Sequence, residues 1–261
     1  MASSAEQFAS SFNFGALSKA ADLKKRIWFT LAALVVYRLG TYIPIPGIDP
    51  AILKEIFDQN AGGILGMFDM FAGGALGRMT IFALNIMPYI SAAIIMQLMT
   101  AVSPNLETLK KEGEAGRKKI NQYTRYLTVL LAAVQAYGIS VGLENMASGG
   151  GAAVTNPGVF FKATTVITLV GGTVFLMWLG EQITARGIGN GISLIIFAGI
   201  VANLPQALAG TLELGRTGAL SAALIILLFV MAVAVIAFIV FIERSQRKIT
   251  VQYPKRQTGN K

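Results

Sequence analysis

The sequence has no cysteine and no histidine, and only 13% of its 261 residues are charged. A water-soluble domain carries about 25% charged residues, so this composition argues against an ordinary soluble globule. Without cysteine and histidine the chain has no disulfides, no thiol nucleophile, no imidazole acid–base group and no zinc site built from these ligands. Most common catalytic centres are therefore excluded, and we expect neither a bound metal nor a cofactor.

Apolar residues are abundant instead: 54% of the chain is hydrophobic, and the mean hydropathy is +0.61. At 1.5 Å per residue, the long apolar runs would form helices of roughly 25 to 40 Å, matching a hydrocarbon core of about 30 Å when tilt is allowed. The predicted fold class is an all-α polytopic membrane protein, a bundle of six transmembrane helices. The six predicted spans are 27–43, 76–102, 126–143, 159–179, 188–208 and 219–242.

The positions of lysine and arginine predict the orientation, because these residues accumulate in cytoplasmic loops. With the N-terminal segment inside, seventeen of the 22 Lys and Arg residues fall on the cytoplasmic side. Both ends of the chain are therefore expected to be cytoplasmic. The predicted organisation is a cytoplasmic segment 1–26, a helical bundle 27–208 containing a basic loop at 104–125, a sixth span 219–242, and an incomplete basic loop 243–261.

Two polar residues interrupt apolar surroundings. Arg38 lies about one turn from the end of the first predicted span, where a long side chain can snorkel to the interface. Asp69 lies in the glycine-rich stretch 62–74, and the sequence suggests no role for it. This stretch is too short and too rich in glycine to cross the bilayer as a helix, so it is either a re-entrant segment or an external loop.

The glycines at 187–191 follow no strand and open an apolar run, so we interpret them as the turn into the fifth helix rather than a dinucleotide motif. The residues alone leave three functions open. They are a channel, a secondary transporter with a site at a broken helix, and a membrane scaffold without a pore.

Five separated strings along the chain are distinctive: IPIPG at 43–47, GGALGRMTIFALNIMPYISAAIIMQLMT at 73–100, KKEGEAGRKKINQYTRY at 110–126, WLGEQITARGIGNGISLIIFAGIV at 178–201 and ERSQRKITVQYPKRQ at 243–257. These strings resemble the SecY family, the channel-forming subunits of the bacterial protein translocon. The resemblance covers nearly the whole chain. It implies ten spans in two pseudo-symmetric halves around a pore, of which this chain holds the first six.

The resemblance also implies roles for particular residues. A hydrophobic pore ring would include Ile86, Ile90, Ile192 and Ile196, and a re-entrant plug at 62–78 would use Ile64, Leu65, Met67, Phe68 and Phe71. Ser91 and Gln135 would face a lateral gate through which signal sequences leave toward lipid. Without the resemblance, these residues would be interpreted as helix packing or lipid contacts.

Basic residues in two cytoplasmic loops would contact the ribosome and the SecA motor ATPase, although the positive-inside rule or attraction to anionic lipid also explains their charge. These residues are Lys110, Lys111, Arg117, Lys118, Lys119, Arg244, Arg247, Lys248, Lys255 and Arg256. Further expected partners are the SecE and SecG subunits, signal peptides, nascent chains and membrane lipids. The function implied is a passive protein-conducting channel in the bacterial inner membrane, without enzymatic activity.

Overall fold

The structure is a computed structural model, and it describes residues 21–59, 66, 69–70, 72–148 and 151–246. The chain divides into two compact units, Met1–Leu204 and Pro205–Lys261. The first unit contains α3 (Ala21–Gly40), α4 (Pro50–Gln59), α6 (Met87–Val102), α7 (Pro104–Lys111), α8 (Glu114–Asn145), β1 (Ala147–Ser148), β2 (Gly151–Ala152), α9 (Val159–Arg186) and α10 (Gly191–Ala202). The second contains α11 (Leu204–Arg216), except its first residue, and α12 (Ala222–Arg244).

The all-α fold class is confirmed, since the described strands form only one antiparallel hairpin of two residues each. Four described stretches are long and apolar enough to span a membrane, or five if the bent pair α6 and α7 forms one span. The four are α8, α9, Gly191–Arg216 and α12. The first predicted span does form a helix, α3, but this helix is not among the four stretches. It carries Lys24, Lys25, Arg26 and Arg38 in its 20 residues.

The second predicted span, 76–102, is wrong as a continuous helix. Helix α6 begins only at Met87, and residues 72–86, named here the irregular segment, form turns. Met79 and Asn85 have φ angles of 43° and 50°, which lie outside the right-handed helical region. Pro88 lies in the first turn of α6, where its missing N–H costs no helical hydrogen bond. The prediction of a helix here rested on apolar composition alone, and composition does not indicate where the backbone departs from helical geometry.

The fifth predicted span, 188–208, falls largely within the stretch Gly191–Arg216, which is long and apolar enough to cross a membrane although it contains a one-residue break between two helices. Helix α10 ends at Ala202 and α11 starts at Leu204, with Pro205 in the first turn of the new helix. The interpretation of residues 187–191 as a helix-entry turn is confirmed. The Asn190 side chain accepts hydrogen bonds from the backbone N–H groups of Ile192 and Ser193, which satisfies two donors left free at a helix N-terminus.

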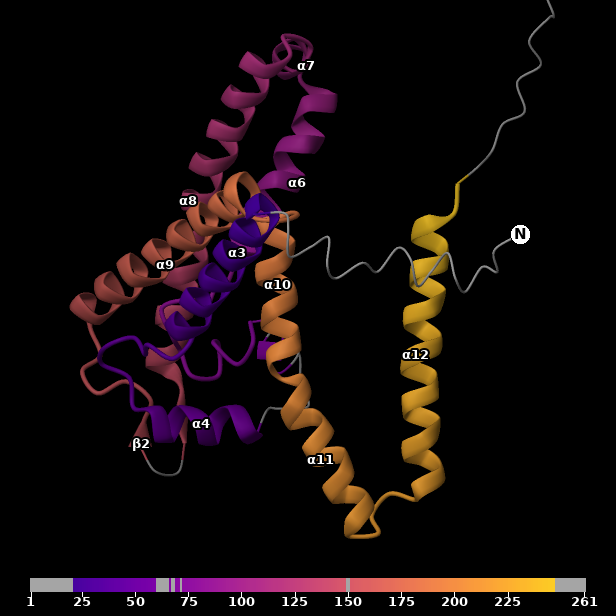
Figure 1. The fold of residues 1–261 in the computed structure, drawn as a ribbon. Helices are drawn as coiled ribbons and strands as arrows, with labels where there is room; N and C mark the ends of the chain where they lie inside the picture. Colours follow the sequence, from indigo (N-terminus) through magenta and orange to yellow (C-terminus); the bar gives the residue numbers. More distant parts are fainter. Residues whose placement is uncertain (1–20, 60–65, 67–68, 71, 149–150, 247–261) are drawn as a thin grey trace, which may run out of the picture. The chain divides into compact units, whose positions relative to one another are not determined.

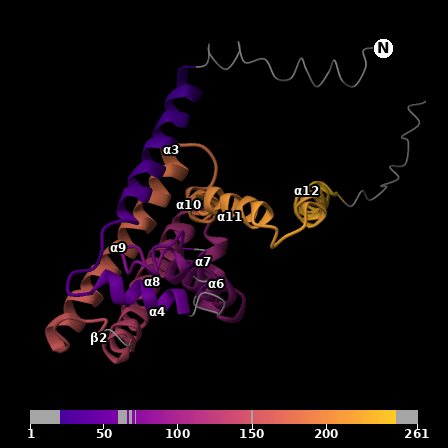
Figure 2. The ribbon, with the colours of Figure 1, turned by 90° about the horizontal axis from the view of Figure 1, so that it is seen from below.

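The irregular segment lies between two hydrophobic clusters of the first unit. Helix α8 packs against α6 and α9, while α3 and α10 pack against α9 (Figure 1, Figure 2). Met79 and Ala83 join a cluster with Ala132 and Ala136 of α8. The second cluster draws from the segment, α3, α9 and α10, and its buried members are Ala33, Tyr37, Phe82, Ile86, Leu176, Leu179, Ile183 and Ile195. Burial on two sides therefore stabilises a segment without regular secondary structure of its own.

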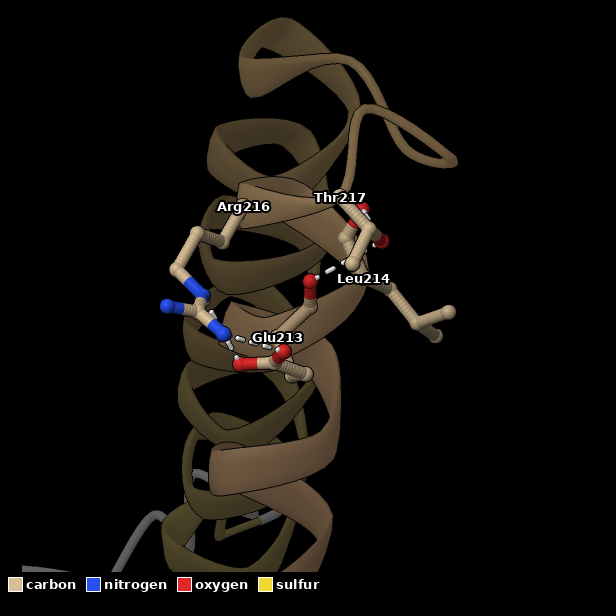
Figure 3. A network of polar contacts seen from close by, with 4 residues as sticks. All are labelled: Glu213, Leu214, Arg216 and Thr217. Carbon is tan, nitrogen blue, oxygen red and sulfur yellow. Dashed lines mark hydrogen bonds and ion pairs between the residues drawn. The ribbon is translucent and has the colours of Figure 1, made fainter.

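The second unit consists of two helices, α11 and α12, joined by a short turn. Figure 3 shows how α11 ends: the Arg216 guanidinium binds both carboxylate oxygens of Glu213, at 3.1 and 2.8 Å. The Thr217 hydroxyl donates to the Glu213 and Leu214 carbonyls, which also accept the backbone N–H groups of Thr217 and Leu220. The Ser221 hydroxyl accepts from Leu224 N–H at the start of α12. None of the residues of α12 is buried against the other described residues.

Candidate functional site

The four isoleucines implied for a pore ring lie in or against the second hydrophobic cluster. Ile86 is fully buried and immediately precedes α6, and the Ile90 N–H donates to the Ile86 carbonyl at 3.1 Å. Ile90, Ile192 and Ile196 are half-buried and pack against the same cluster. The structure therefore brings together residues that are about one hundred positions apart in the sequence. Their role as a ring stays a prediction.

A polar cavity of about 430 Å³ lies beside Ile192. Arg125 of α8 binds Glu181 of α9 through two hydrogen bonds of 3.0 and 2.8 Å at this cavity, and both side chains are partly exposed. The other lining residues are Tyr89, Asn121, Thr184, Ala185 and Asn190. One apolar residue of the proposed ring therefore borders a polar, open space.

A second cavity, of about 630 Å³, brings together Ser91 and Gln135, the two residues implied for the lateral gate. Ser91 comes from α6 and Gln135 from α8. The rest of the lining is mostly apolar and comes from the irregular segment and the same two helices: Ala72, Leu76, Ala83, Leu84, Asn85, Met87, Gly138 and Ile139. An apolar lining with a few polar groups suits an apolar ligand that must be oriented. The gate itself stays a prediction.

The apolar residues implied for the plug, Ile64, Leu65, Met67, Phe68 and Phe71, lie outside the described residues. The described part of this region gives Asp69 a role that the sequence did not suggest. Its carboxylate accepts the Gly77 N–H at 2.6 Å, and its carbonyl accepts the Gly74 N–H at 2.9 Å. Asp69 therefore closes the turn formed by residues 72–78, which we name the glycine turn.

Arg38, predicted to snorkel to the interface, contacts the glycine turn. Its guanidinium donates to the Gly73 carbonyl at 3.0 Å and to the Tyr42 hydroxyl at 3.3 Å. Arg78, from the turn itself, donates to the same Gly73 carbonyl at 3.2 Å and to the Gly74 carbonyl at 2.9 Å. Both guanidinium groups lie over the Tyr42 ring. The only local signal was the four-residue spacing of Arg38 and Tyr42, which indicates neighbours on one helix face.

The basic region 104–125, predicted as a loop, is helical: it forms α7 and the beginning of α8, joined at Gly113, whose φ is +76°. Lys110, Lys111, Arg117, Lys118 and Lys119 are all exposed there. Arg244 is exposed at the end of α12. The remaining predicted contacts, Arg247, Lys248, Lys255 and Arg256, lie outside the described residues.

Comparisons with known proteins give a consistent result. A family model described as SecY matches residues 80–261. Proteins named protein translocase subunit SecY from Rickettsia conorii and Escherichia coli are 58% and 57% identical over 92% of this chain. The matched region is 55% of the first relative and 54% of the second, so the chain spans about half their length. A relative of the same name from Buchnera aphidicola is 58% identical and is covered over 67% of its length.

Solved structures give a weaker likeness. A chain described as a protein conducting channel is 22% identical, with a TM-score of 0.49, and the match covers 74% of this chain and 38% of the other. The same values hold for Sec61 in a canine ribosome–channel complex from the endoplasmic reticulum.

Proposed function

Since this chain belongs to the SecY family, we propose that it forms the first half of a channel subunit that conducts unfolded secretory proteins across a bacterial cytoplasmic membrane. The observation that carries the proposal is 58% identity to a translocase subunit over 92% of the chain. Membership of this family favours a channel over the small-solute carrier and the scaffold. The channel performs no covalent chemistry, so a partner must supply the energy for transport.

In this proposal the isoleucines of the pore ring narrow the path that the translocated chain takes across the membrane. Ile90, Ile192 and Ile196 present branched apolar side chains that exclude hydrated ions and still yield around a peptide. Ile86 is fully buried in the described state, so it reaches the path only after the irregular segment moves. The polar cavity beside Ile192 supports this direction of the path, because it holds water-compatible groups next to the constriction.

The cavity that contains Ser91 and Gln135 would receive hydrophobic signal and transmembrane segments before they leave sideways into lipid. A hydrogen bond between helices in lipid contributes roughly 1 kcal/mol, which biases such a seam toward closure without preventing entry of an apolar helix. The mostly apolar lining and the pairing of two helices at this cavity support the assignment.

The proposed partners are the SecE and SecG subunits, the SecA motor ATPase, the ribosome and anionic lipid. The exposed cations at the corner of α7 and α8 support the ribosome contact, since ribosomal RNA offers phosphates that pair with lysine and arginine. Binding there should weaken as salt concentration rises. This arrangement requires the corner of α7 and α8, and both ends of this chain, to face the cytoplasm.

A photo-crosslinking residue at Ile192 of the full protein tests the conduit. Membranes containing this variant are challenged with a stalled secretory chain, and a cytosolic chain of equal length serves as substrate control. The matched position is Ile167 of α9, which is 72% exposed and lines neither cavity. Crosslinks from Ile192 to the secretory chain, with lipid adducts at Ile167, are the expected result. Lipid adducts at both positions would contradict the proposal.

A further inference from the structure

The glycine turn is attached to α3 by two arginines that meet on one aromatic ring. Arg38 belongs to α3, Arg78 belongs to the turn, and both donate hydrogen bonds to the Gly73 carbonyl. Their guanidinium carbons lie 5.2 and 4.4 Å from the centre of the Tyr42 ring. Two cations so close together repel each other, and the electron-rich ring face and the shared carbonyl oxygen offset that repulsion.

The same carbonyl group lies where the turn meets α10. Gly73 has a φ of +65°, and a Cβ on it would lie 2.9 Å from the Gly199 carbonyl oxygen. The two backbones therefore touch without a side chain between them. Gly199 is on the helix that carries Ile192 and Ile196, so Arg38 clamps the turn between α3 and this helix.

Immediately after the turn, the chain is held by a different kind of contact. The Ile45 N–H donates to the Met79 carbonyl at 2.9 Å, and the Ile81 N–H donates to the Ile43 carbonyl at 3.0 Å. These backbone bonds hold residues 79–81 without any help from the arginines. The positive φ of Met79 lies at the boundary between the two parts. The turn can therefore separate from α10 about this point while the rest of the irregular segment stays in the core.

We propose that Arg38, Tyr42 and Arg78 form a latch that holds the glycine turn against α10 and keeps the path beside Ile192 and Ile196 closed. The second half of this statement rests on the proposed channel function, whereas the latch itself rests on the contacts above. Arg38 and Arg78 are positioning residues, because they act through the Gly73 carbonyl. Release of the turn then requires loss of the arginine contacts with Tyr42.

A single thiol measures the release of the turn directly. The chain has no cysteine, so Ala75→Cys introduces its only thiol, at a position that is fully buried in the turn. The full protein, with any thiols outside this chain removed, is reconstituted into vesicles, and the rate of maleimide labelling is measured. Tyr42→Leu and Arg38→Met, each combined with Ala75→Cys, should raise this rate about fivefold or more. The two substitutions break different parts of the latch, so either one suffices if the other fails to fold.

Two controls separate a latch from a general loss of structure. Tyr42→Phe keeps the ring and loses only the contacts of the hydroxyl, including the 3.3 Å hydrogen bond from Arg38, so labelling should stay within about twofold of the parent. Arg216→Met removes an arginine from the second unit, where it pairs with Glu213, and should leave the rate unchanged. Labelling that stays at the parent rate in both Tyr42→Leu and Arg38→Met would overturn the latch.

Ion leak from the same vesicles is a separate readout. Faster labelling together with increased leak in Tyr42→Leu, and neither change in Tyr42→Phe, supports both the latch and the channel. Faster labelling without any leak would leave the latch intact and count against the proposed conduit, so the two failures are distinguishable.

Discussion

Two neighbouring glycines of α9 give a paired test of how closely the irregular segment packs on this helix. A Cβ added to Gly171 would meet no atom within 4 Å, apart from its own helix. A Cβ added to Gly172 would overlap the carbonyl oxygen of Ile81 and press on the Phe82 ring. Gly172→Ala should therefore force two backbones apart, whereas Gly171→Ala should be accommodated without movement.

The expected magnitude follows from comparing the two substitutions. Alanine is favoured over glycine in a helix interior by about 1 kcal/mol, and this gain is common to both variants. Overpacking a well-filled site costs about 1 to 3 kcal/mol, and the obstructing atom at Gly172 belongs to the backbone, which cannot rotate away. The free energy of unfolding of Gly172→Ala should therefore lie about 1 to 3 kcal/mol below that of Gly171→Ala. This difference corresponds to a factor of about 5 to 150 in the unfolding equilibrium.

The assay is a denaturant titration of the detergent-solubilised full protein, with both variants measured side by side. Trp178 lies two turns along the same helix, and its ring lies 5.7 Å from that of Phe175, so its fluorescence reports on this packing. Phe175 in turn stacks on Phe82 of the irregular segment. Equal stability of the two alanine variants would refute the reasoning, because it would mean that the Ile81 carbonyl does not lie against α9.

Three further substitutions follow from the same contacts. Tyr37→Phe should leave the free energy of unfolding unchanged or raise it by up to about 1 kcal/mol, because the buried Tyr37 hydroxyl has no hydrogen-bond partner among the described residues; a clear loss in the same titration would contradict this. Asn190→Ala should cost about 1 kcal/mol by removing both N-cap hydrogen bonds of α10, and Asn190→Asp should restore most of the loss. Glu181→Gln breaks the ion pair with Arg125, but should change stability by less than about 1 kcal/mol because the pair is partly exposed to solvent; a larger loss would indicate that water is excluded from this cavity.

The long helices α8, α9 and α12 were predictable from the sequence because their signal is local. Each is an apolar run long enough to cross the hydrocarbon core, and a helix satisfies its backbone hydrogen bonds within itself. The family was also recognisable from short strings of residues, since these do not depend on the fold. The entry turn of α10 belongs with them, because Asn190 caps donors only two and three residues ahead.

The structure of the irregular segment could not be predicted from its local sequence. Its apolar composition resembles that of a helix, and only contacts with distant residues explain why it stays irregular. Because Gly172 has no side chain, the backbone of the irregular segment can lie directly against α9. Residues 43 and 45 form backbone hydrogen bonds with the same segment. The meeting of Ser91 with Gln135 at one cavity likewise depends on how α6 packs against α8.

Arg38 illustrates the division most clearly. The sequence determined that a charged residue lies near the end of an apolar helix, and the cost of burying a charge required either a route to water or a partner. Only the tertiary structure revealed the partners, by placing the Gly73 carbonyl and the Tyr42 ring within reach of the guanidinium. The physical reason is that composition and length act along the chain, whereas a partner for a charge is supplied by whichever segment folds next to it.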